Sequence, residues 1–482
     1  MQAVRSRLLS STSRPLHILH RICGTAPSTC LSAPPRSPLR TIAPSSLSPL
    51  PLRTYATTRE KGPAGPCDET VDETLGPDEF VDALHSRGVR LFTGVPDSLM
   101  KDFLRYVDDH VPKENHIITA NEGGAIGTAV GHYLATRQIP LVYLQNSGLG
   151  NAVNPLLSLA DPSVYSVPML LLVGWRGEPG HRDEPQHRKQ GRIMPQLLDT
   201  LGIAYDVLPD YHDGAAEALD TAIEYCTKKS APYALFVKKN TFTAYKPSSS
   251  HMQEGRDGEG EAKMSRMDAL RTVTDHASHK DVFVATTGFT SRELYEIRLD
   301  RGEPLNRDFL TVGSMGHASA IALGIAASLP SPAFSTPTPS SSPSSLSSSP
   351  TVYCLDGDGA AMMHLGNLST IGASSIAGVR HLVHIVLNNG VHDSVGGQPT
   401  AASHPHLSFA DIARAVGYRH TAKVKTQEEL GEVLSGRIEG EGPYLIEVMC
   451  KPGTLPSLRR PRTSFTSMKE EFIANLSNQL HK

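Results

Sequence analysis

Two oxygen-rich turns carry the residue types best suited to chemistry in this chain. A short apolar run at residues 351–355 predicts a buried strand, and the turn DGDG at 356–359 follows it directly. A second run of strand type at 381–387 leads into NNG at 388–390. Because parallel strands bring their carboxyl ends to the edge where open α/β sheets bind ligands, both turns are expected at that edge.

The side chains of these turns fit a hard cation that holds a diphosphate. Asp358 offers a carboxylate, Asn389 offers an amide carbonyl, and the backbone carbonyl near Val391 offers a third oxygen ligand. Magnesium prefers such oxygens and completes its octahedron with phosphates and water. Gly357 and Gly359 would let the backbone approach the phosphates, and a helix predicted to start near residue 361 would point its amides at them.

Plainer interpretations exist for the first turn. A DGDG sequence alone is more often only a turn. A calcium-binding loop would need Glu at its twelfth position, but counting from Asp356 that position is Asn367. Both turns together, each after an apolar strand, form a more specific pattern, which is similar to the signature of thiamine-diphosphate enzymes.

Glu122 is a third candidate, because it follows a predicted strand at 116–119 and opens a helix of small residues at 125–135. The resemblance to thiamine-diphosphate enzymes implies that this Glu hydrogen-bonds N1′ of the cofactor's aminopyrimidine and so promotes its activation. A Glu at a helix start is also favoured by the helix dipole, so simple capping is the alternative.

A glycine-rich turn at 311–317 precedes a helix of small and apolar residues predicted at 318–328. The same resemblance implies that Met315 wedges under the cofactor and holds it bent. It also implies that carbonyls near Gly313, next to Ser314, meet the amino group of the pyrimidine. Core filling is the ordinary role of a Met and is the alternative here.

The resemblance also implies a substrate pocket, and further polar residues are candidates for its polar side. The set is Asp97, Ser98, Asn146, Ser147, His317, His392 and Asp393. The sequence does not assign which of them donates a proton, and a lone His is more often structural. The charge-dense loop at 175–190, which contains Arg176 and His187, is either a solvated loop or a site for phosphonate or sulfonate oxygens.

Strands that alternate with helical segments predict an α/β fold with parallel sheets. The 482 residues suffice for two or three domains. One domain is predicted at 76–245, a linker rich in Ser, Gly and Glu at 246–265, and a second domain at 266–482. Within the second domain, residues 330–350 are almost pure Ser, Pro and Thr, which predicts a disordered insertion.

The N-terminal segment differs in composition from the rest. Its first 59 residues contain eight Arg and no acidic residue, which is typical of a mitochondrial transit peptide. We therefore expect residues 1–58 to be a disordered transit peptide cleaved near Tyr55, and the protein to reside in the mitochondrial matrix, with the cytoplasm as second choice. A disordered extension without a targeting role is the alternative.

The composition of the chain argues against several classes of binding partner. The formal net charge of −3, without a basic stripe, argues against a nucleic-acid binder. The six cysteines have no metal-ligand spacing and are expected to be reduced thiols. No apolar run approaches the length of a membrane span.

Six stretches together resemble the phosphonopyruvate decarboxylase family, and sulfopyruvate decarboxylase carries similar motifs. They are GVPDSLMKDF (94–103), NEGGAIGTAVGHYLAT (121–136), QNSGLGNAVNPL (145–156), WRGEPG with DEPQH (175–187), TVGSMGHASAIALGIA (311–326) and LNNGVHDSVGGQPT (387–400). The resemblance covers about residues 76–460, whereas the N-terminal segment and the Ser/Pro insertion fall outside it.

This resemblance implies two doubly wound parallel-sheet domains of the thiamine-diphosphate-binding fold, one for the pyrimidine and one for the diphosphate, without a middle domain. It implies decarboxylation of 3-phosphonopyruvate, an anionic 2-oxo acid, to phosphonoacetaldehyde and carbon dioxide, with thiamine diphosphate and Mg²⁺. It also implies a homodimer or homotetramer in which Glu122 and Asp358 of different chains serve one cofactor.

Other functions remain open from the sequence. One is a sulfopyruvate decarboxylase, and another is a different 2-oxo acid decarboxylase or an acetolactate-type carboligase with a neutral substrate. The charge-dense loop and the short two-domain body argue against a neutral substrate. A non-catalytic homologue is the last alternative, and the presence of Glu122, Asp358 and Asn389 argues against it.

Overall fold

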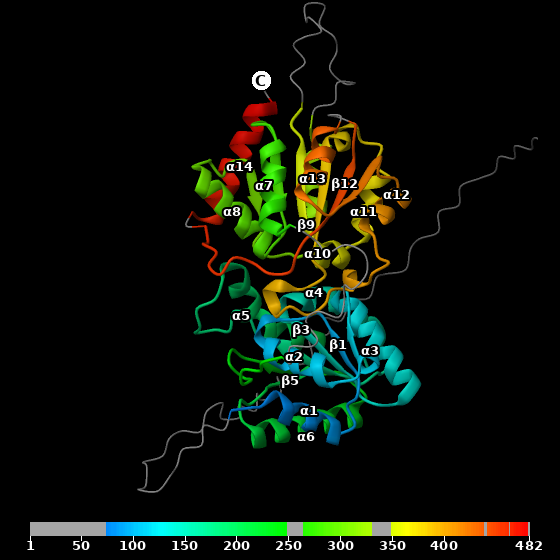
Figure 1. Cartoon of the computed structure of the whole chain (residues 1–482). Coiled ribbons are helices and arrows are strands. Elements are labelled where there is room, and N and C mark those ends of the chain that lie inside the picture. The colour runs from blue at the N-terminus through cyan, green and yellow to red at the C-terminus, as the bar shows by residue number, and fades with distance from the viewer. Residues whose placement is uncertain (1–73, 248–263, 330–348, 438–440, 462, 481–482) are drawn as a thin grey trace, which may run out of the picture. The chain divides into compact units, whose positions relative to one another are not determined.

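The computed structural model describes residues 74–247, 264–329, 349–437, 441–461 and 463–480 (Figure 1). The predicted leader, and most of the predicted linker and Ser/Pro insertion, lie outside these residues. The described residues form two six-stranded sheets in which every strand pairing is parallel, which confirms the predicted α/β class. No helix in the described ranges is both long and apolar enough to span a bilayer.

The first sheet has the strand order β2-β1-β3-β4-β6-β5. Its strands are β1 (Phe92–Gly94), β2 (His116–Ile118), β3 (Leu141–Gln145), β4 (Leu170–Gly174), β5 (Ala204–Val207) and β6 (Tyr233–Val237). Every residue of β4 and β6 is buried, since helices cover both faces of this sheet. Such strands need continuous apolar runs, and LLLVG and YALFV supply them.

Six helices cover the first sheet. They are α1 (Pro77–Ser86), α2 (Lys101–His110), α3 (Glu122–Thr136), α4 (Leu149–Pro155), α5 (Pro185–Leu201) and α6 (His212–Lys229). The first core contains buried side chains of α1, α2 and α6, including Phe80 and Phe103. The second contains side chains of α3, α4 and α5, including Ile126 and Met194, so the two sets of helices cover opposite faces.

The second sheet repeats this plan with the order β11-β12-β10-β9-β7-β8. Its strands are β7 (Val282–Ala285), β8 (Asp308–Leu310), β9 (Val352–Gly357), β10 (Leu382–Asn388), β11 (His420–Val424) and β12 (Tyr444–Met449). The first strand of the domain, β7, lies between β8 and β9, so the strand order reverses beside β9. Ligands bind at such reversal points in open α/β sheets, and the DGDG turn follows β9.

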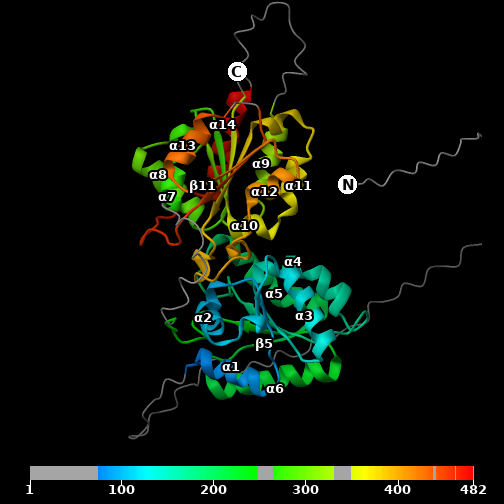
Figure 2. The same cartoon turned by 45° about the vertical axis from the view of Figure 1, so that its right-hand side comes forward.

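The helices of the second half are α7 (Arg266–His276), α8 (Phe289–Arg301), α9 (Ala318–Ala327), α10 (Asp358–Met363), α11 (Gly366–Gly372), α12 (Phe409–Ala415), α13 (Gln427–Ser435) and α14 (Phe465–Leu480). In Figure 2, α7, α8 and α13 lie on one face of the sheet, and α9, α11 and α12 lie on the other. The last helix, α14, contributes Met468 to one core and Phe472 to the other.

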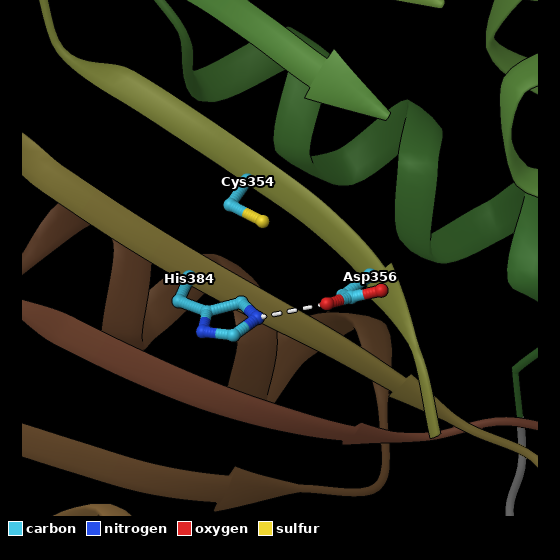
Figure 3. A group of neighbouring side chains, drawn as sticks. All are labelled: Cys354, Asp356 and His384. Carbon is cyan, nitrogen blue, oxygen red and sulfur yellow. Dashed lines mark ion pairs between the residues drawn. The ribbon is translucent and has the colours of Figure 1, made fainter. Parts of the chain in front are cut away.

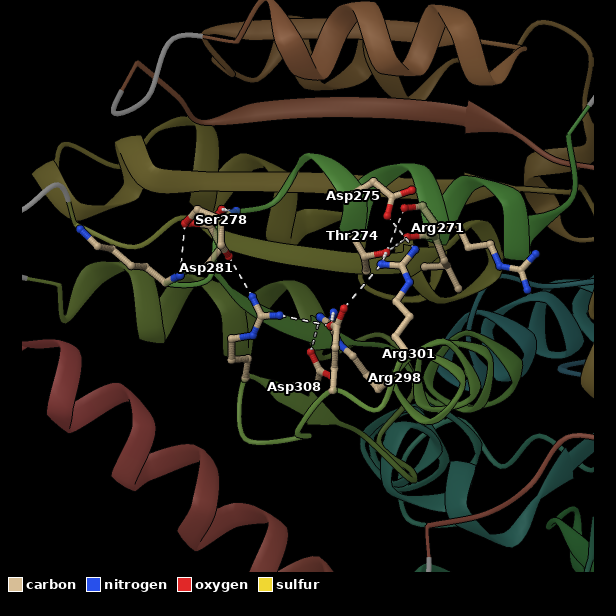
Figure 4. Close-up of polar contacts among 12 residues, drawn as sticks. Arg271, Thr274, Asp275, Ser278, Asp281, Arg298, Arg301 and Asp308 are labelled. Atoms are coloured by element: carbon tan, nitrogen blue, oxygen red, sulfur yellow. Dashed lines mark hydrogen bonds and ion pairs between the residues drawn. The ribbon is translucent and has the colours of Figure 1, made fainter.

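A buried ion pair joins α8 to the edge strand β8 (Figure 4). The Arg298 side chain donates to both carboxylate oxygens of Asp308, from Nε at 2.8 Å and from Nη2 at 3.0 Å. Its Nη1 donates to Glu303 at 2.6 Å. Both partners of the main pair are only 1% exposed. Such a pair leaves an uncompensated buried charge if either partner is removed.

Candidate active site

The predicted residues of the first domain gather at one edge of its sheet, because β2, β1, β3 and β4 are neighbours and all run in the same direction. Glu122 follows β2, Asp97 and Ser98 follow β1, Asn146 and Ser147 follow β3, and Arg176 follows β4. The four carboxyl ends therefore bring these residues together, as the alternation of strands and helices predicted.

Glu122 is the first residue of α3, and its neighbour Asn121 caps that helix by accepting from the Gly124 amide at 2.8 Å. The Glu122 side chain is 5% exposed, and its Oε2 accepts a hydrogen bond from Asn151 Nδ2 at 2.8 Å. A Cβ at Gly148 would lie 2.2 Å from Glu122 Oε1. Glycine at 148 therefore makes room for the carboxyl group.

Burial raises the pKa of Glu122 above its ordinary value of 4.5, and the hydrogen bond from Asn151 offsets part of that rise. Such a carboxyl group keeps its proton to a higher pH than an ordinary Glu does, which favours hydrogen bonding to a ring nitrogen. Asn151 and Gly148 lie in QNSGLGNAVNPL (145–156), one of the six stretches that carry the resemblance. Neither was predicted as a site residue, because only the fold brings them to Glu122.

Asp97 is fully buried and lies at the carboxyl end of β1. Its carboxylate accepts hydrogen bonds from Gln145 Nε2 at 2.5 Å and from the Leu99 amide at 2.9 Å. Burial raises the pKa of Asp97, and these two hydrogen bonds act in the opposite direction. In this arrangement Asp97 organises the turn after β1, and its predicted catalytic role stays a prediction.

Arg176 forms a two-point pair with Asp183, with Nε at 2.9 Å and Nη2 at 2.6 Å from the two carboxylate oxygens. Its Nη1 donates to Ser98 Oγ at 3.0 Å. Although burial acts to raise it, the pKa of Asp183 is held well below its usual range, chiefly by Arg176. The charge of Arg176 is therefore balanced within its own loop, and its predicted contact with a substrate anion stays a prediction.

Two polar atoms near Arg176 are buried without a hydrogen-bond partner in the described part of the chain: Nδ1 of His187 and Oδ1 of Asn146. The amide of Asn146 donates to the Arg176 carbonyl at 2.7 Å, and Ser147 Oγ donates to Gln145 Oε1 at 2.7 Å. Burial, followed by the charge of Arg176, lowers the pKa of His187 to about 4, so this ring is neutral near pH 7. Buried polar atoms of this kind are suited to meet a ligand.

In the second domain, the two oxygen-rich turns lie side by side, because β9 and β10 pair with Gly357 opposite Leu387. Asp358 is 3% exposed, and its Oδ2 accepts from the Gly390 amide at 3.0 Å and from Thr400 Oγ1 at 2.6 Å. This confirms that both turns share one sheet edge. Thr400 was not predicted, although it ends the sixth stretch of the resemblance.

Asn389 is oriented by Asp393, which accepts from Asn389 Nδ2 at 2.6 Å. Asp393 also accepts from Arg266 Nη1 at 3.0 Å and from the Gly453 amide at 3.1 Å. Arg266 is in turn paired with buried Glu293. With three donors on its carboxylate, Asp393 is placed to position Asn389. This geometry favours a positioning role over the substrate contact predicted for Asp393.

The glycines of the DGDG turn have different surroundings. A Cβ at Gly359 would lie 2.8 Å from His392 Cε1, so glycine is needed for the close approach of the loop after β10. A Cβ at Gly357 would meet only Thr286 Cγ2, at 4.0 Å, which leaves this backbone open to a ligand. The helix predicted from residue 361 begins at Asp358. Burial lowers the pKa of His392 to about 4.

The turn between β8 and α9 has an unusual backbone, with Ser314 at φ +55° and Gly316 at φ +86°. A Cβ at Gly316 would lie 2.6 Å from His364 Cδ2. His317 is exposed, and its ring centroid lies 4.6 Å from that of His364. Strained backbone of this kind clusters at ligand sites. The cofactor contacts expected of Gly313, Ser314 and Met315, and the catalytic role of His317, stay predictions.

The donor set of the second domain suits a hard divalent cation. The carboxylate of Asp358, the amide oxygen of Asn389 and the carbonyl of Val391 are oxygen donors on one loop edge. Asn389 commits its nitrogen to Asp393, and its oxygen, which accepts from the Val391 amide at 3.2 Å, keeps a second lone pair for a cation. These residues fit magnesium bound to a diphosphate, since magnesium takes oxygen ligands and shares them with phosphates.

Comparison with known proteins agrees with this arrangement. The N-terminal TPP binding domain of thiamine pyrophosphate enzymes matches residues 76–200, and their C-terminal TPP binding domain matches residues 296–448. A phosphonopyruvate decarboxylase of Streptomyces viridochromogenes is 32% identical over 83% of this chain and 94% of its own length. A second phosphonopyruvate decarboxylase, of Streptomyces hygroscopicus, is 32% identical over 80% of this chain and 90% of its own length. A sulfopyruvate decarboxylase of Methanosarcina acetivorans is 27% identical over 79% of this chain and 92% of its own length.

These relatives correct the predicted localisation. The Streptomyces enzymes are bacterial, and bacteria have no mitochondria. Residues 1–58 lie outside the described residues, so the structure lends a transit peptide no support. The prediction of a mitochondrial matrix protein with a transit peptide is therefore wrong. An Arg-rich, acid-free composition is shared by targeting peptides and by other extensions, and so it misled the prediction.

The two matched domains and the two arrangements of side chains point to the same cofactor. Both domains bind thiamine pyrophosphate in the proteins that define them. The described residues offer a buried carboxyl for a ring nitrogen and an oxygen set for a diphosphate-bound cation. The chain belongs to the thiamine pyrophosphate enzymes, as a decarboxylase of the family that contains phosphonopyruvate decarboxylase.

Proposed function

We propose that this protein decarboxylates 3-phosphonopyruvate to phosphonoacetaldehyde and carbon dioxide, with thiamine diphosphate and Mg²⁺. The observation that carries the proposal is the match to two phosphonopyruvate decarboxylases over at least 90% of their lengths. The hydrogen-bonded Glu122 at one sheet edge and the pair of Asp358 and Asn389 at the other support it.

The bound cofactor would accept the electrons released as carbon dioxide leaves. The protein's own part is to hold and orient the reacting groups. Glu122, kept in place by Asn151, would hold a proton at the ring nitrogen of the pyrimidine. Asp358, Asn389 and Val391 would hold the magnesium ion, and Gly357 would admit the diphosphate. Excluding water and presenting polar groups to the substrate would fall to the residues after β1, β3 and β4.

The substrate side of the proposal rests on the residues around Arg176. The substrate carries two anionic groups, and the unsatisfied Nδ1 of His187, which can donate in one tautomer, is buried beside this loop. Because His187 is neutral near pH 7, it would contact an anion as a hydrogen-bond donor, while Arg176 and Ser98 supply charge and a hydroxyl group. The residue that protonates the product is not assigned.

The direct test is carbon dioxide release by the purified chain. Phosphonopyruvate, sulfopyruvate and pyruvate would be offered separately, each with and without thiamine diphosphate and Mg²⁺. The expected result is release from phosphonopyruvate that needs both cofactors and that is much weaker with the other two acids. Turnover of pyruvate alone, or no turnover of any acid by a chain that binds the cofactor, would contradict the proposal.

Sulfopyruvate decarboxylation is the second candidate, because the sulfopyruvate decarboxylase of Methanosarcina acetivorans matches over 92% of its length. A sulfonate carries one negative charge where a phosphonate near neutral pH approaches two. A preference for sulfopyruvate in the same assay would keep the cofactor chemistry and the roles of Glu122 and Asp358. It would change only the tail group that the pocket recognises.

We further propose that the working unit is a homodimer or homotetramer in which each active site takes Glu122 from one chain and Asp358 from another. Closed symmetric assemblies are the common form of soluble oligomers. The proposal is supported by the resemblance to enzymes that place the cofactor between chains. It predicts that mixing two different inactive variants restores part of the activity.

A further inference from the structure

Three side chains that play no part in the proposed reaction face one another inside the second domain (Figure 3). They are Cys354 and Asp356 of β9 and His384 of β10, and all three are fully buried. Their ligand atoms lie within 4.8 Å of one another. The two strands bring them together, because Cys354 pairs directly with His384 and Asp356 lies two residues further along the same face.

Two of these side chains have polar atoms left without a hydrogen bond in the described part of the chain. They are Oδ2 of Asp356 and Nε2 of His384, which lie 3.5 Å apart. The other nitrogen of this ring, Nδ1, lies 3.2 Å from the Tyr418 hydroxyl. When Nδ1 donates to Tyr418, the lone pair of Nε2 faces a carboxylate oxygen. In that tautomer the two buried acceptors need a positive centre between them, whereas in the other tautomer the proton on Nε2 takes that place.

We propose that Cys354, Asp356 and His384 bind a thiophilic divalent cation of the zinc class. One thiolate, one carboxylate and one neutral imidazole are ordinary zinc ligands, and together they balance its two charges. Zinc sits about 2.0–2.1 Å from nitrogen and oxygen ligands, which puts two such atoms about 3.3 Å apart in a tetrahedron. The observed 3.5 Å between Nε2 and Oδ2 is close to that spacing.

The surroundings of the cluster fit such an ion. Tyr418 holds the second nitrogen of His384, which is how metal-binding imidazoles are commonly oriented. Burial, with the charge of Asp356, raises the pKa of Cys354 well above its ordinary value, so the free thiol stays neutral. A bound cation displaces that proton. Water, or the second oxygen of Asp356, completes the coordination shell.

This site differs from the proposed magnesium site in chemistry and in purpose. Magnesium takes hard oxygens and has little affinity for a thiolate, whereas zinc, cobalt and similar ions bind sulfur well. The cluster ties β9 to β10 just before the turns that carry Asp358 and Asn389. A cation here would therefore act as a structural clamp behind the cofactor-binding edge.

The test is a metal analysis of the untagged full-length chain, expressed with added zinc and exchanged into buffer that contains excess Mg²⁺. The expected result is about one equivalent of zinc per chain. Cobalt(II) in place of zinc should produce an intense sulfur-to-cobalt charge-transfer band together with visible bands of tetrahedral cobalt. The spectrum needs no variant, so a variant that fails to fold cannot obscure the result.

Cys354→Ser and His384→Gln should each abolish the tightly held metal, and Cys354→Ser should remove the charge-transfer band. Cys226→Ser and Cys450→Ser are matched controls that should keep both, because those buried thiols donate to backbone carbonyls. A wild-type chain that holds no transition metal and shows no cobalt–sulfur band would overturn the proposal. So would metal retained by both Cys354→Ser and His384→Gln. Neither outcome depends on which acid the enzyme decarboxylates.

Discussion

At the scale of single residues, the site depends on carboxyl groups whose environments differ. Glu122 is buried with one side-chain donor, and its pKa is raised. Asp358 is also buried but is held by a backbone amide and by Thr400. The first environment raises the pKa of its carboxyl group, and the second fixes the Asp358 side chain with two hydrogen-bond donors. The two carboxyl groups are thereby suited to different tasks.

Glu122→Gln should lower turnover by about 10²–10⁴-fold, because the amide cannot hold the proton at the ring nitrogen. The same change should stabilise the cofactor-free protein at alkaline pH. A raised pKa means that the folded state binds more protons than the unfolded state, so the contribution of Glu122 to stability falls as pH rises through the raised pKa.

Chemical denaturation of the cofactor-free protein between pH 5 and pH 8.5 measures this effect. The difference in unfolding free energy between Glu122→Gln and wild type should grow in favour of the variant as pH rises. The exposed Glu114→Gln is the control and should change neither turnover nor the pH profile. A turnover loss below tenfold in Glu122→Gln would contradict the role given to this residue.

A second prediction at this scale concerns the chain of contacts from Arg266 through Asp393 to Asn389. Asp393→Asn weakens the acceptor that orients the Asn389 amide. The concentration of Mg²⁺ needed for half-maximal activity should rise about 10- to 100-fold, as it does when residues that support metal ligands are changed. Turnover at saturating Mg²⁺ should change much less, since Asp393 does not touch the ion.

The control for that measurement is Asp411→Asn, an exposed aspartate paired with Arg414. It should leave the magnesium dependence unchanged. If Asp393 instead contacts the substrate, Asp393→Asn would raise KM for the acid and leave the magnesium requirement as in wild type. Comparing the change in the Mg²⁺ requirement with the change in KM for the acid therefore decides between the positioning role and the predicted substrate contact.

At the scale of elements, the edge strand β8 depends on a buried ion pair more than on its own length. It has three residues, and Arg298 of α8 holds its first residue, Asp308 (Figure 4). A strand this short has little intrinsic preference, because strand formation depends on packing against neighbours. The pair also reaches Glu303, in the connection between α8 and β8.

Asp308→Asn should lower the free energy of unfolding by about 3–5 kcal/mol, because it leaves the buried Arg298 charge with only the more exposed Glu303 as a partner. Urea denaturation with matched slopes measures the change. Asp275→Asn is the control, since Asp275 pairs with Arg301 in a solvent-exposed position. Asp275→Asn should change the free energy of unfolding by less than about 1 kcal/mol. Equal effects of the two substitutions would show that burial of the Arg298 pair is unimportant.

At the scale of the whole molecule, the two domains repeat one architecture but supply different chemistry. Each sheet carries its site residues at the carboxyl edge, where strand order reverses. The first domain contributes the buried Glu122, and the second contributes the oxygen donors around Asp358. Because Glu122 and Asp358 lie in different domains, an experiment that mixes chains altered at one or the other is informative.

Chains carrying Glu122→Ala and chains carrying Asp358→Ala should each be inactive alone. If every site combines Glu122 of one chain with Asp358 of another, random mixing restores one intact site in each hybrid dimer. About a quarter of wild-type activity should then return, because half of the dimers are hybrids and half of their sites are intact. The assay is carbon dioxide release after the mixed chains are dissociated and reassociated.

A wild-type sample taken through the same dissociation is the control for recovery. No gain of activity in a mixture that demonstrably contains hybrids would mean that both residues of a site belong to one chain. That result would remove the shared-site proposal and leave the decarboxylase activity untouched.

The long buried strands were predictable because their apolar runs are contiguous. β4, β6, β10 and β12 lie within a residue or two of the apolar runs at 168–173, 233–237, 381–387 and 444–449, which predict strands. The short edge strands β5, β8 and β11 were not predicted. β11 has the sequence HTAKV, of which only the last residue is buried, so its pairing with β12 comes from tertiary context. The domain limits drawn from composition remain a prediction.

The sequence by itself determined the chemistry that is local: the DGDG turn after one strand, the NNG turn after another, and Glu122 at a helix start. Such motifs are short and contiguous, so chain order alone reveals them. Only the tertiary structure decided their partners: Asn151 and Gly148 for Glu122, Thr400 for Asp358, Arg266 through Asp393 for Asn389, and His384 for Asp356. These contacts join residues far apart in the chain, and they depend on strand register and loop packing that no local pattern encodes.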